Sequence, residues 1–295
     1  MAKLRIGTCG WKYESWKGLI YSANPEINYL KEYSAYFNSV EIPQWFSSLY
    51  GINNIIMPQS YVVKNYKESV TPQFKFSIKL PNTITLTHLS KSDKDQLPVL
   101  NPHFLSLDLL NEFINSIKPL HKNLGPLMFQ FDYLNTEKMK SQFEFQGLFR
   151  EFVSNLPERF LFAIETRNPN YLNETYFQFL RDNKLGQVFM QGYDMPPIYE
   201  IYNHYKDYFK DFTVIRLHGP DKQGIETRTG GEWNKIVDPK DDEIEKICFM
   251  VLQLLERDVD VYLNVNNHYE GSAPRTIQKI RNLLKHSAAN RMVDV

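Results

Sequence analysis

The segment TVIRLHGP, residues 213–220, has the pattern of a buried β-strand that ends in two polar residues. Side chains alternate between the two faces of a strand, so Ile215 and Leu217 share one face while Arg216 and His218 share the other. A Gly-Pro turn follows directly. The segment therefore predicts a strand with one apolar face and a second face that becomes polar at its carboxyl end.

Short strand-like runs that end in a polar cluster recur along the whole chain. Besides residues 213–219, they cover residues 4–10, 39–42, 74–80, 126–131, 160–167, 186–192 and 259–267. Amphipathic segments with helical spacing lie at 25–37, where Asn24 is the expected N-cap, and at 104–120, 241–257 and 273–286.

This alternation of strands and helices is typical of a parallel α/β sheet. Eight such units in 295 residues predict a (β/α)8 barrel of the TIM type, as a single domain over residues 1–295. A doubly wound open sheet is the alternative. It would more often show a glycine-rich phosphate fingerprint after the first strand, and none is present.

Five other runs repeat the division between faces that residues 213–219 show. One face is apolar, while the other becomes polar toward the carboxyl end, where it carries Glu41, Lys79, Gln130, Glu165 with Arg167, and Asn266. Active sites of barrels lie at the carboxyl ends of the strands. We therefore expect these side chains to meet Arg216 and His218 at one rim.

Four residues of this rim are candidates for catalysis. Glu41 and Glu165 could serve as acid and base, and His218 titrates near neutral pH and suits proton transfer. Lys79 could act as a point charge, as a general base or as a Schiff-base former. The pattern favours acid–base chemistry.

The other rim residues suit binding of a small anionic ligand. Arg167 and Arg216 have the planar fork geometry that binds carboxylate or phosphate groups, and Lys79 adds a third positive charge. Gln130 and Asn266 contribute amide groups beside them.

The same residues also have a structural interpretation. Glu165 and Arg167 lie two residues apart on one strand and could belong to a belt of ion pairs. Arg216 could neutralise Glu41 or Glu165, because a buried charge needs a partner.

A metal site is a further alternative, formed by Glu41, Glu165, His218 and His88. No HxH, HxxxH or DxD spacing supports it, and the three nearby cations disfavour a dication. We therefore expect no cofactor.

Two long connections are candidate lids over the rim. The first, residues 84–103, carries His88, which would reach back over the mouth of the barrel to a ligand; the alternative is a surface histidine. The second, residues 219–233, has glycines that permit hinge angles and Trp233, which would close over a ligand; the alternative is a flexible insertion.

The composition limits the class of protein. Lysine plus arginine and aspartate plus glutamate both number 34, so the formal net charge of zero indicates neither nucleic acid nor an anionic membrane as a partner. The N-terminus lacks the apolar core of a signal peptide, and the longest apolar run, residues 247–255, is about half a membrane span. Without a CxxC pair, we expect a cytoplasmic protein, with Cys9 as a nucleophile or a small buried thiol.

Several of these segments together carry a family resemblance. They are IGTCGWKYESWKG (6–18), FNSVEI (37–42), TPQFKFSIKLP (71–81), LGPLMFQF (124–131), IETRNP (164–169), VIRLHG (214–219) and VNNHYEGSAP (265–274). In this order, along nearly the whole chain, they resemble the YecE-like family, domain-of-unknown-function family 72. The resemblance implies a TIM-barrel-like fold and a reaction that is not established. It also adds Trp11 and Asn267 to the expected ligand-binding residues.

The chain departs from the pattern of that family at the edges of the expected pocket. Pro43 stands where the family usually has asparagine, Ser47 where a tyrosine is expected, and Asn168 where a histidine usually follows the arginine. These changes imply a ligand that differs from the ligand of typical members.

Three hypotheses about function follow from the sequence. The first is a metal-independent enzyme that acts on a small anionic substrate. The second is a metal-dependent hydrolase or isomerase that acts on a phosphodiester or a sugar. The third is a ligand-binding barrel without catalysis, against which the two carboxylates count. The sequence leaves the oligomeric state open.

Overall fold

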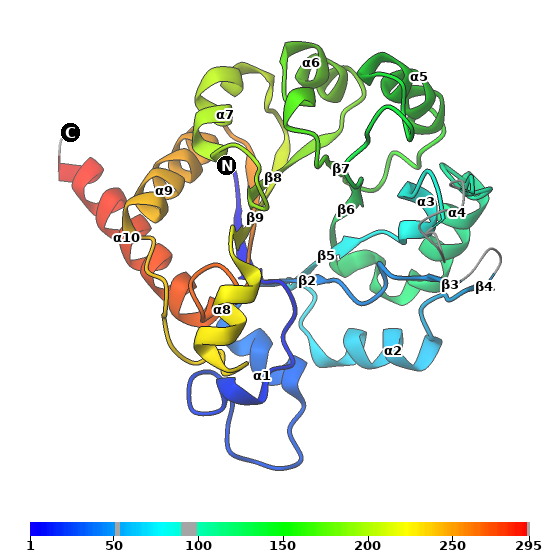
Figure 1. Cartoon of the computed structure of the whole chain (residues 1–295). Helices are drawn as coiled ribbons and strands as arrows, with labels where there is room; N and C mark the ends of the chain where they lie inside the picture. The colour runs from blue at the N-terminus through cyan, green and yellow to red at the C-terminus, as the bar shows by residue number, and fades with distance from the viewer. Residues whose placement is uncertain (51–53, 90–98, 294–295) are drawn as a thin grey trace.

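Eight parallel strands form a nearly closed barrel in the computed structural model, which describes residues 1–50, 54–89 and 99–293 (Figure 1). The strands are β1 (Leu4–Thr8), β2 (Ser39–Ile42), β5 (Lys75–Lys79), β6 (Leu124–Gln130), β7 (Phe162–Glu165), β8 (Gly186–Gly192), β9 (Phe212–Gly219) and β10 (Asp260–Val265). They are paired in the order β1-β10-β9-β8-β7-β6-β5-β2. The eight predicted strands and the TIM-type barrel are thus confirmed.

Helices surround the strands as an outer ring (Figure 1). They are α1 (Tyr29–Tyr36), α2 (Ser60–Ser69), α3 (Asn82–Thr85), α4 (Leu107–Ser116), α5 (Gln142–Val153), α6 (Glu174–Asp182), α7 (Ile198–Tyr205), α8 (Lys222–Thr229), α9 (Asp241–Glu256) and α10 (Ala273–Val293). Short 3-10 turns lie at Glu14–Trp16, Lys118–Asn123, Pro169–Tyr171 and Lys206–Tyr208, and a small hairpin pairs β3 (Leu49–Tyr50) with β4 (Asn54–Ile55). Within the described ranges, no helix has both the length and the apolar character needed to cross a membrane.

The predicted helix over residues 25–37 was wrong at its start. The helix begins at Tyr29, because Asn28 is the cap: its side-chain oxygen accepts the backbone N–H of Lys31 at 3.0 Å. The Asn24 side chain instead accepts the N–H of Glu26 within a turn. A capping asparagine satisfies an N–H that the first helical turn leaves free, and Asn28 rather than the expected Asn24 does so here.

The seam between β1 and β2 is closed mainly by side chains. One isolated bridge pairs Cys9 with Glu41. The Tyr33 hydroxyl accepts the N–H of Thr8 at 2.9 Å and donates to the carbonyl of Ser39 at 3.0 Å, which ties the two strands together. A Cβ atom at Gly7 would lie 1.9 Å from that same carbonyl oxygen, so only glycine lets the strands approach this closely.

Two separate apolar cores confirm the predicted division between strand faces. The larger core lies between the strands and the helices. A small second cluster, which consists of Met128, Ala163, Val188, Phe212, Val214 and Tyr262, fills the barrel interior from the opposite faces of the strands. Polar residues of the same faces follow toward the carboxyl ends, as the sequence pattern predicted.

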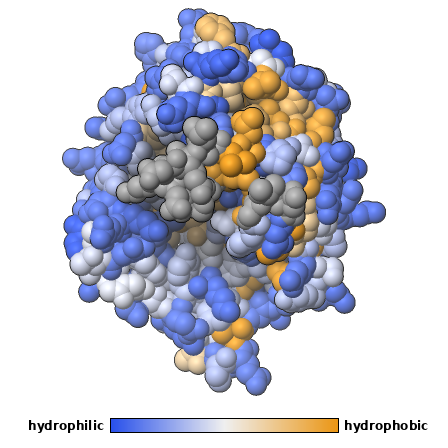
Figure 2. All heavy atoms as spheres, turned by 45° about the vertical axis from the view of Figure 1, so that its right-hand side comes forward, coloured by the Kyte–Doolittle hydropathy of each residue, from blue (hydrophilic) through white to orange (hydrophobic). Residues whose placement is uncertain are grey.

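The face that carries β3 and β4 is mostly hydrophilic, with hydrophobic areas between the polar side chains (Figure 2). Across the described surface, the large hydrophobic side chains that remain most exposed include Tyr61, Leu100 and Phe143. Most other apolar side chains are buried in the two cores.

Candidate functional site

A network of buried ion pairs lies at the carboxyl ends of β2, β7 and β9. The Arg216 guanidinium binds Glu41 through two bonds, from Nε to Oε2 at 2.8 Å and from Nη2 to Oε1 at 2.7 Å. Its Nη1 donates to Oε2 of Glu165. Arg167 Nη2 lies 2.7 Å from the other oxygen of Glu165. The predicted convergence of these four residues is therefore confirmed.

Glu165 and Arg216 keep their charges although the network is buried. Glu41, Glu165 and Arg216 are at most 2% exposed. Burial raises the pKa of Glu165, but Arg216 and Arg167 outweigh it and hold that pKa below its usual value. Burial likewise lowers the pKa of Arg216, and the two carboxylates reverse this effect and raise it. Both carboxylates are engaged by arginine, as the structural interpretation of Arg216 proposed.

Lys79 adds a positive charge that the network does not neutralise. With Arg167 and Arg216 it makes three cations beside the two carboxylates, a surplus of one positive charge. Its ammonium lies 3.6 Å from the centre of the Phe46 ring and forms no ion pair with any described residue. Burial, followed by the charge of Arg216, lowers the pKa of Lys79 to about 8.

His218 is held as a neutral imidazole beside this cluster. Burial and then the charge of Arg216 lower its pKa well below the usual value. Nε2 lies 3.5 Å from the Cys9 sulfur, and Nδ1 lies 3.1 Å from the Tyr193 hydroxyl. A neutral imidazole can donate one hydrogen bond and accept another, so His218 can pass a proton between its two neighbours or to a ligand.

Sequence reasoning missed the place of Tyr193, and of the two roles expected for Cys9 the structure supports the small buried thiol. The Cys9 thiol donates to Oε2 of Glu41 at 3.5 Å, and burial and then the charge of Glu41 raise its pKa. It is therefore protonated rather than an activated thiolate. Tyr193 follows β8 with a positive φ of 52°. The centre of its ring lies 4.6 Å from the guanidinium carbon of Arg167. The QGYD turn after β8 was the available signal for this residue.

Gln130 lies close to the network, because it is paired in register with Glu165. Its side chain is buried, and its Oε1 has no hydrogen-bond partner among the described residues. An unpaired buried oxygen of this kind is available to a ligand.

Asn266 and Asn267 build the turn between β10 and α10. The Asn266 side chain accepts the N–H of His268, and the Asn267 side chain accepts the N–H of Ala273, both at 2.9 Å. Their oxygens are thus used inside the loop. Neither residue makes a side-chain bond to the ion network, so ligand binding by this pair stays a prediction.

The two segments expected to act as lids differ in their structure. His88 is half-buried, and its Nδ1 lies 3.0 Å from the Thr87 hydroxyl, with no described contact to the network. Residues 90–98 of its loop lie outside the described residues. The segment 219–233 forms α8, and the N–H of Trp233 donates to Ser15 at 3.0 Å while its ring packs against His268. It is a helix anchored to the loop after β1.

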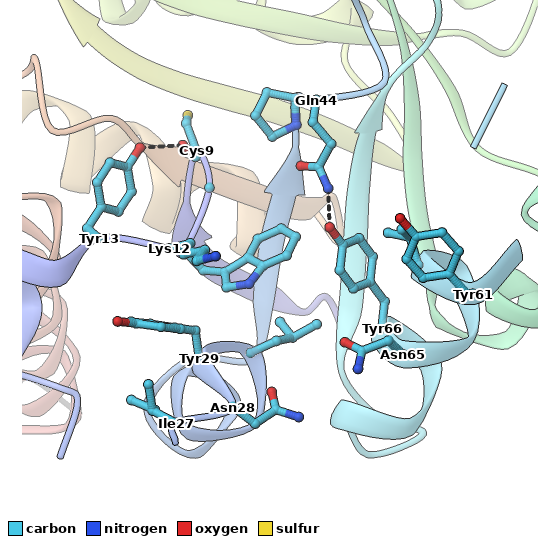
Figure 3. Close-up of a pocket in the computed structure, with 15 residues that line it drawn as sticks. Cys9, Lys12, Tyr13, Ile27, Asn28, Tyr29, Gln44, Tyr61, Asn65 and Tyr66 are labelled. Carbon is cyan, nitrogen blue, oxygen red and sulfur yellow. Dashed lines mark hydrogen bonds between the residues drawn. The ribbon is translucent and has the colours of Figure 1, made fainter. Parts of the chain in front are cut away.

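Trp11 lines a pocket of about 800 Å³ beside the network (Figure 3). The walls come from the loops after β1 and β2, from the start of α1 and from α2. The Trp11 ring meets the Tyr66 ring edge to face, with centres 5.0 Å apart. Cys9 forms one end of this pocket, which therefore borders the ion network.

The three departures from the family pattern lie in different places. Pro43 lines this pocket, and Ser47 is exposed. Asn168 is buried, and its side chain both accepts from and donates to the backbone of Leu134, at 2.8 and 2.9 Å. Asn168 therefore holds the loop after β6, whereas Pro43 can alter what the pocket accepts.

The alternative of a metal site finds no ready set of ligands. No group of three or more His, Cys, Asp or Glu side chains gathers in an arrangement suited to a metal ion within the part of the chain that the structure describes. Glu41 and Glu165, which that alternative requires, direct their oxygens at guanidinium groups instead.

Comparison with known proteins decides the family. The model of the family "Protein of unknown function DUF72" matches residues 5–294. The chain belongs to the DUF72 family. Two solved members share its fold at 20% sequence identity and a TM-score of 0.65: one from Enterococcus faecalis V583, with 96% of this chain and 95% of that chain covered, and one from Thermotoga maritima MSB8, with 96% and 99% covered.

A curated DUF72-like relative covers less of the chain. UPF0759 protein YecE of Escherichia coli K12 is 26% identical over 170 residues, which is 56% of this chain and 49% of that protein. The match thus spans about half the length of the curated relative. The resemblance noted from the sequence motifs is confirmed, and the family name assigns no reaction.

Proposed function

We propose that this DUF72 protein is an enzyme that binds a small anionic substrate at the carboxyl end of the barrel and acts on it by acid–base chemistry. The observation that carries the proposal is the surplus positive charge of Lys79. Its amine lies beside the buried network without a carboxylate partner among the described residues. A cation held in this way favours an anion, which would restore neutrality to a site shielded from water.

The proposed roles of these residues differ from the roles that the sequence led us to expect. Arg216 is enclosed by two carboxylates, so in this proposal it positions Glu41 and Glu165 and does not hold the substrate. Lys79 and the partly exposed Arg167 are the groups that contact the anion. Gln130 supplies an amide beside them.

Proton transfer falls to His218 rather than to the paired carboxylates. Burial, followed by nearby positive charges, holds the pKa of His218 well below its usual value. A bound anion offsets these charges and raises that pKa toward neutrality, so the imidazole becomes a better base when substrate is present. The Tyr193 hydroxyl at Nδ1 orients the ring and relays the proton.

A ligand-binding barrel without catalysis is the second candidate. It is favoured by one observation: both carboxylates are bound by arginine, which leaves neither free to act as a base. It predicts binding of the same anions without any product. Incubation of the protein with a panel of phosphorylated and carboxylated metabolites, followed by NMR, separates the two candidates, since only an enzyme converts one of them.

The anion-binding step is tested by titration with inorganic phosphate. We expect phosphate to bind the wild-type protein and to lose its affinity in Lys79→Gln. Lys75→Gln is the matched control, because Lys75 occupies the opposite end of the same strand and donates to the carbonyl of Lys122. Equal affinity of phosphate for the wild-type protein and Lys79→Gln would refute the proposed site.

A further inference from the structure

We propose that the aromatic pocket beside Cys9 binds the ring of a phosphorylated or acidic sugar, whose anionic group reaches Lys79. This inference rests on the proposed function for the anionic group and names the class of the remaining substrate. The aromatic pocket is the 800 Å³ cavity that α1, α2 and the loops after β1 and β2 enclose. This volume is typical of small-molecule sites.

The aromatic pocket borders the ion network at Cys9. Cys9 forms part of its lining, and the same sulfur lies 3.5 Å from Glu41 and 3.5 Å from His218. Figure 3 shows the Tyr13 hydroxyl directed at the backbone carbonyl of Cys9, at 3.4 Å. A ring bound here would therefore lie next to the proposed proton carrier.

The loop after β2 joins the aromatic pocket to Lys79. Pro43 and Gln44 of this loop line the cavity, while the ring of Phe46, two residues further on, lies under the Lys79 ammonium. In the sheet, Glu41 is paired with Ser77, two residues before Lys79 on β5. The same loop therefore borders both the cavity and Lys79, and the proposal places the ring of the ligand in the cavity and its anion at Lys79.

The chemistry of the walls suits an uncharged ring that carries hydroxyl groups. Five aromatic residues line the cavity, namely Trp11, Tyr13, Tyr29, Tyr61 and Tyr66. Lys12 is the one charged side chain in this lining of described residues, which contains no carboxylate. The Tyr61 hydroxyl and the Asn65 amide offer donors and acceptors to a ligand, while Gln44 donates to the Tyr66 hydroxyl, as Figure 3 shows.

The orientation of the rings favours a sugar over a planar aromatic base. Trp11 and Tyr66 meet at 82°, so these two rings cannot hold a flat base between parallel faces. A single exposed aromatic face suits the C–H face of a sugar ring, while the hydroxyl groups at its edge reach tyrosine and amide groups. Unstacked bases are bound mainly by stacking on planar groups, and Trp11 and Tyr66 do not form a pair of parallel faces for one.

Tyr61 allows a test that does not disturb the core. It lies on α2 and is 70% exposed, so Tyr61→Ala leaves the fold intact. Tyr133→Ala is the matched control, because Tyr133 is 57% exposed and lies outside the aromatic pocket. Both variants are compared with the wild-type protein and with Lys79→Gln.

The experiment measures dissociation constants for inorganic phosphate, hexose phosphates, hexuronic acids, free hexoses and nucleoside monophosphates. We expect a hexose phosphate or hexuronate to bind at least about tenfold tighter than inorganic phosphate. Tyr61→Ala should remove most of that difference and leave the affinity for inorganic phosphate unchanged, and Tyr133→Ala should change neither. Comparison of the dissociation constants of hexose phosphates and hexuronic acids shows whether the site prefers a phosphate or a carboxylate.

Two results would overturn the inference. The first is that the sugar ligands bind no tighter than inorganic phosphate. The second is that nucleoside monophosphates bind tighter than every sugar ligand. The proposed function fails separately, if inorganic phosphate binds the wild-type protein and Lys79→Gln equally. Free hexoses that bind both proteins alike would still support the aromatic pocket in that case.

Discussion

Lys79 carries a positive charge that has no carboxylate partner among the described residues, because Arg216 binds both carboxylates of the buried network. Its pKa falls from the usual 10.5 to about 8, chiefly because of burial. The folded state thus binds the proton of this amine more weakly than the unfolded state does. A residue that costs stability in this way is typical of a functional position.

Replacement of Lys79 by methionine should stabilise the protein near neutral pH. At pH 7 the lysine is charged in both states, and the folded state bears the cost of that charge, of order 1–3 kcal/mol. Between pH 8 and 10.5 the folded state releases the proton first, so wild-type stability should rise relative to Lys79→Met. Urea unfolding of both proteins from pH 7 to 10 measures this difference, and a less stable variant at pH 7 would contradict the prediction.

Replacement of Arg216, in contrast, should destabilise the protein. Arg216→Met leaves Glu41 and Glu165 buried without their main partner, which should cost about 3–5 kcal/mol of unfolding free energy. The exposed pair of Lys64 and Glu68 provides the control, because Lys64→Ala should cost less than about 1 kcal/mol. Equal stability of Arg216→Met and the wild-type protein would show that the carboxylates are not charged and buried together.

At the scale of elements, the seam between β1 and β2 depends on Gly7. Gly7→Ala places a Cβ atom 1.9 Å from the carbonyl oxygen of Ser39, so the strands must separate. We expect a loss of several kcal/mol in unfolding free energy, because packed backbone cannot yield as a flexible side chain does. Thermal unfolding measures the loss.

Gly147 gives the matched control for that substitution. It lies inside α5, and a Cβ atom there meets no atom within 4 Å. Gly147→Ala should therefore stabilise the protein, by about 0.5–1 kcal/mol, through better helix propensity. A similar effect of both substitutions would show that close approach at the seam does not matter.

The strands were predictable because each carries its own signal in the sequence. Alternation in residues 213–219 placed Arg216 and His218 on the inner face, and both lie there. The start of α1 was not predictable, since Asn24 and Asn28 are both good caps and tertiary packing selects between them. Local pattern is enough to find an element, but it is weaker at element boundaries.

The contents of the site were predictable in part. Residues on regular strands were found, but Tyr193 enters from a turn with positive φ, which no alternation describes. The pairing of Arg216 with two carboxylates depends on distances between strands far apart in the sequence, up to 175 residues for Glu41. Sequence alone could propose this pairing and its functional alternative but could not choose between them.

At the scale of the whole molecule, the barrel brings two kinds of surface together. The ion network lies at the carboxyl ends of the barrel strands, and the loops after β1 and β2 contribute to the aromatic pocket (Figure 3). Cys9 links the two, because it lines the aromatic pocket and its thiol donates to Glu41 of the network. In the proposed function, neighbouring parts of the fold supply the charge and the shape for one ligand.

The most direct test of this account is a crystal structure of the protein grown in the presence of phosphate. The account predicts a phosphate ion within hydrogen-bond distance of Lys79 Nζ, with Arg167 beside it and Arg216 still bound to Glu41 and Glu165. Phosphate bound only at exposed surface lysines, with the space beside Lys79 free of any anion, would contradict it.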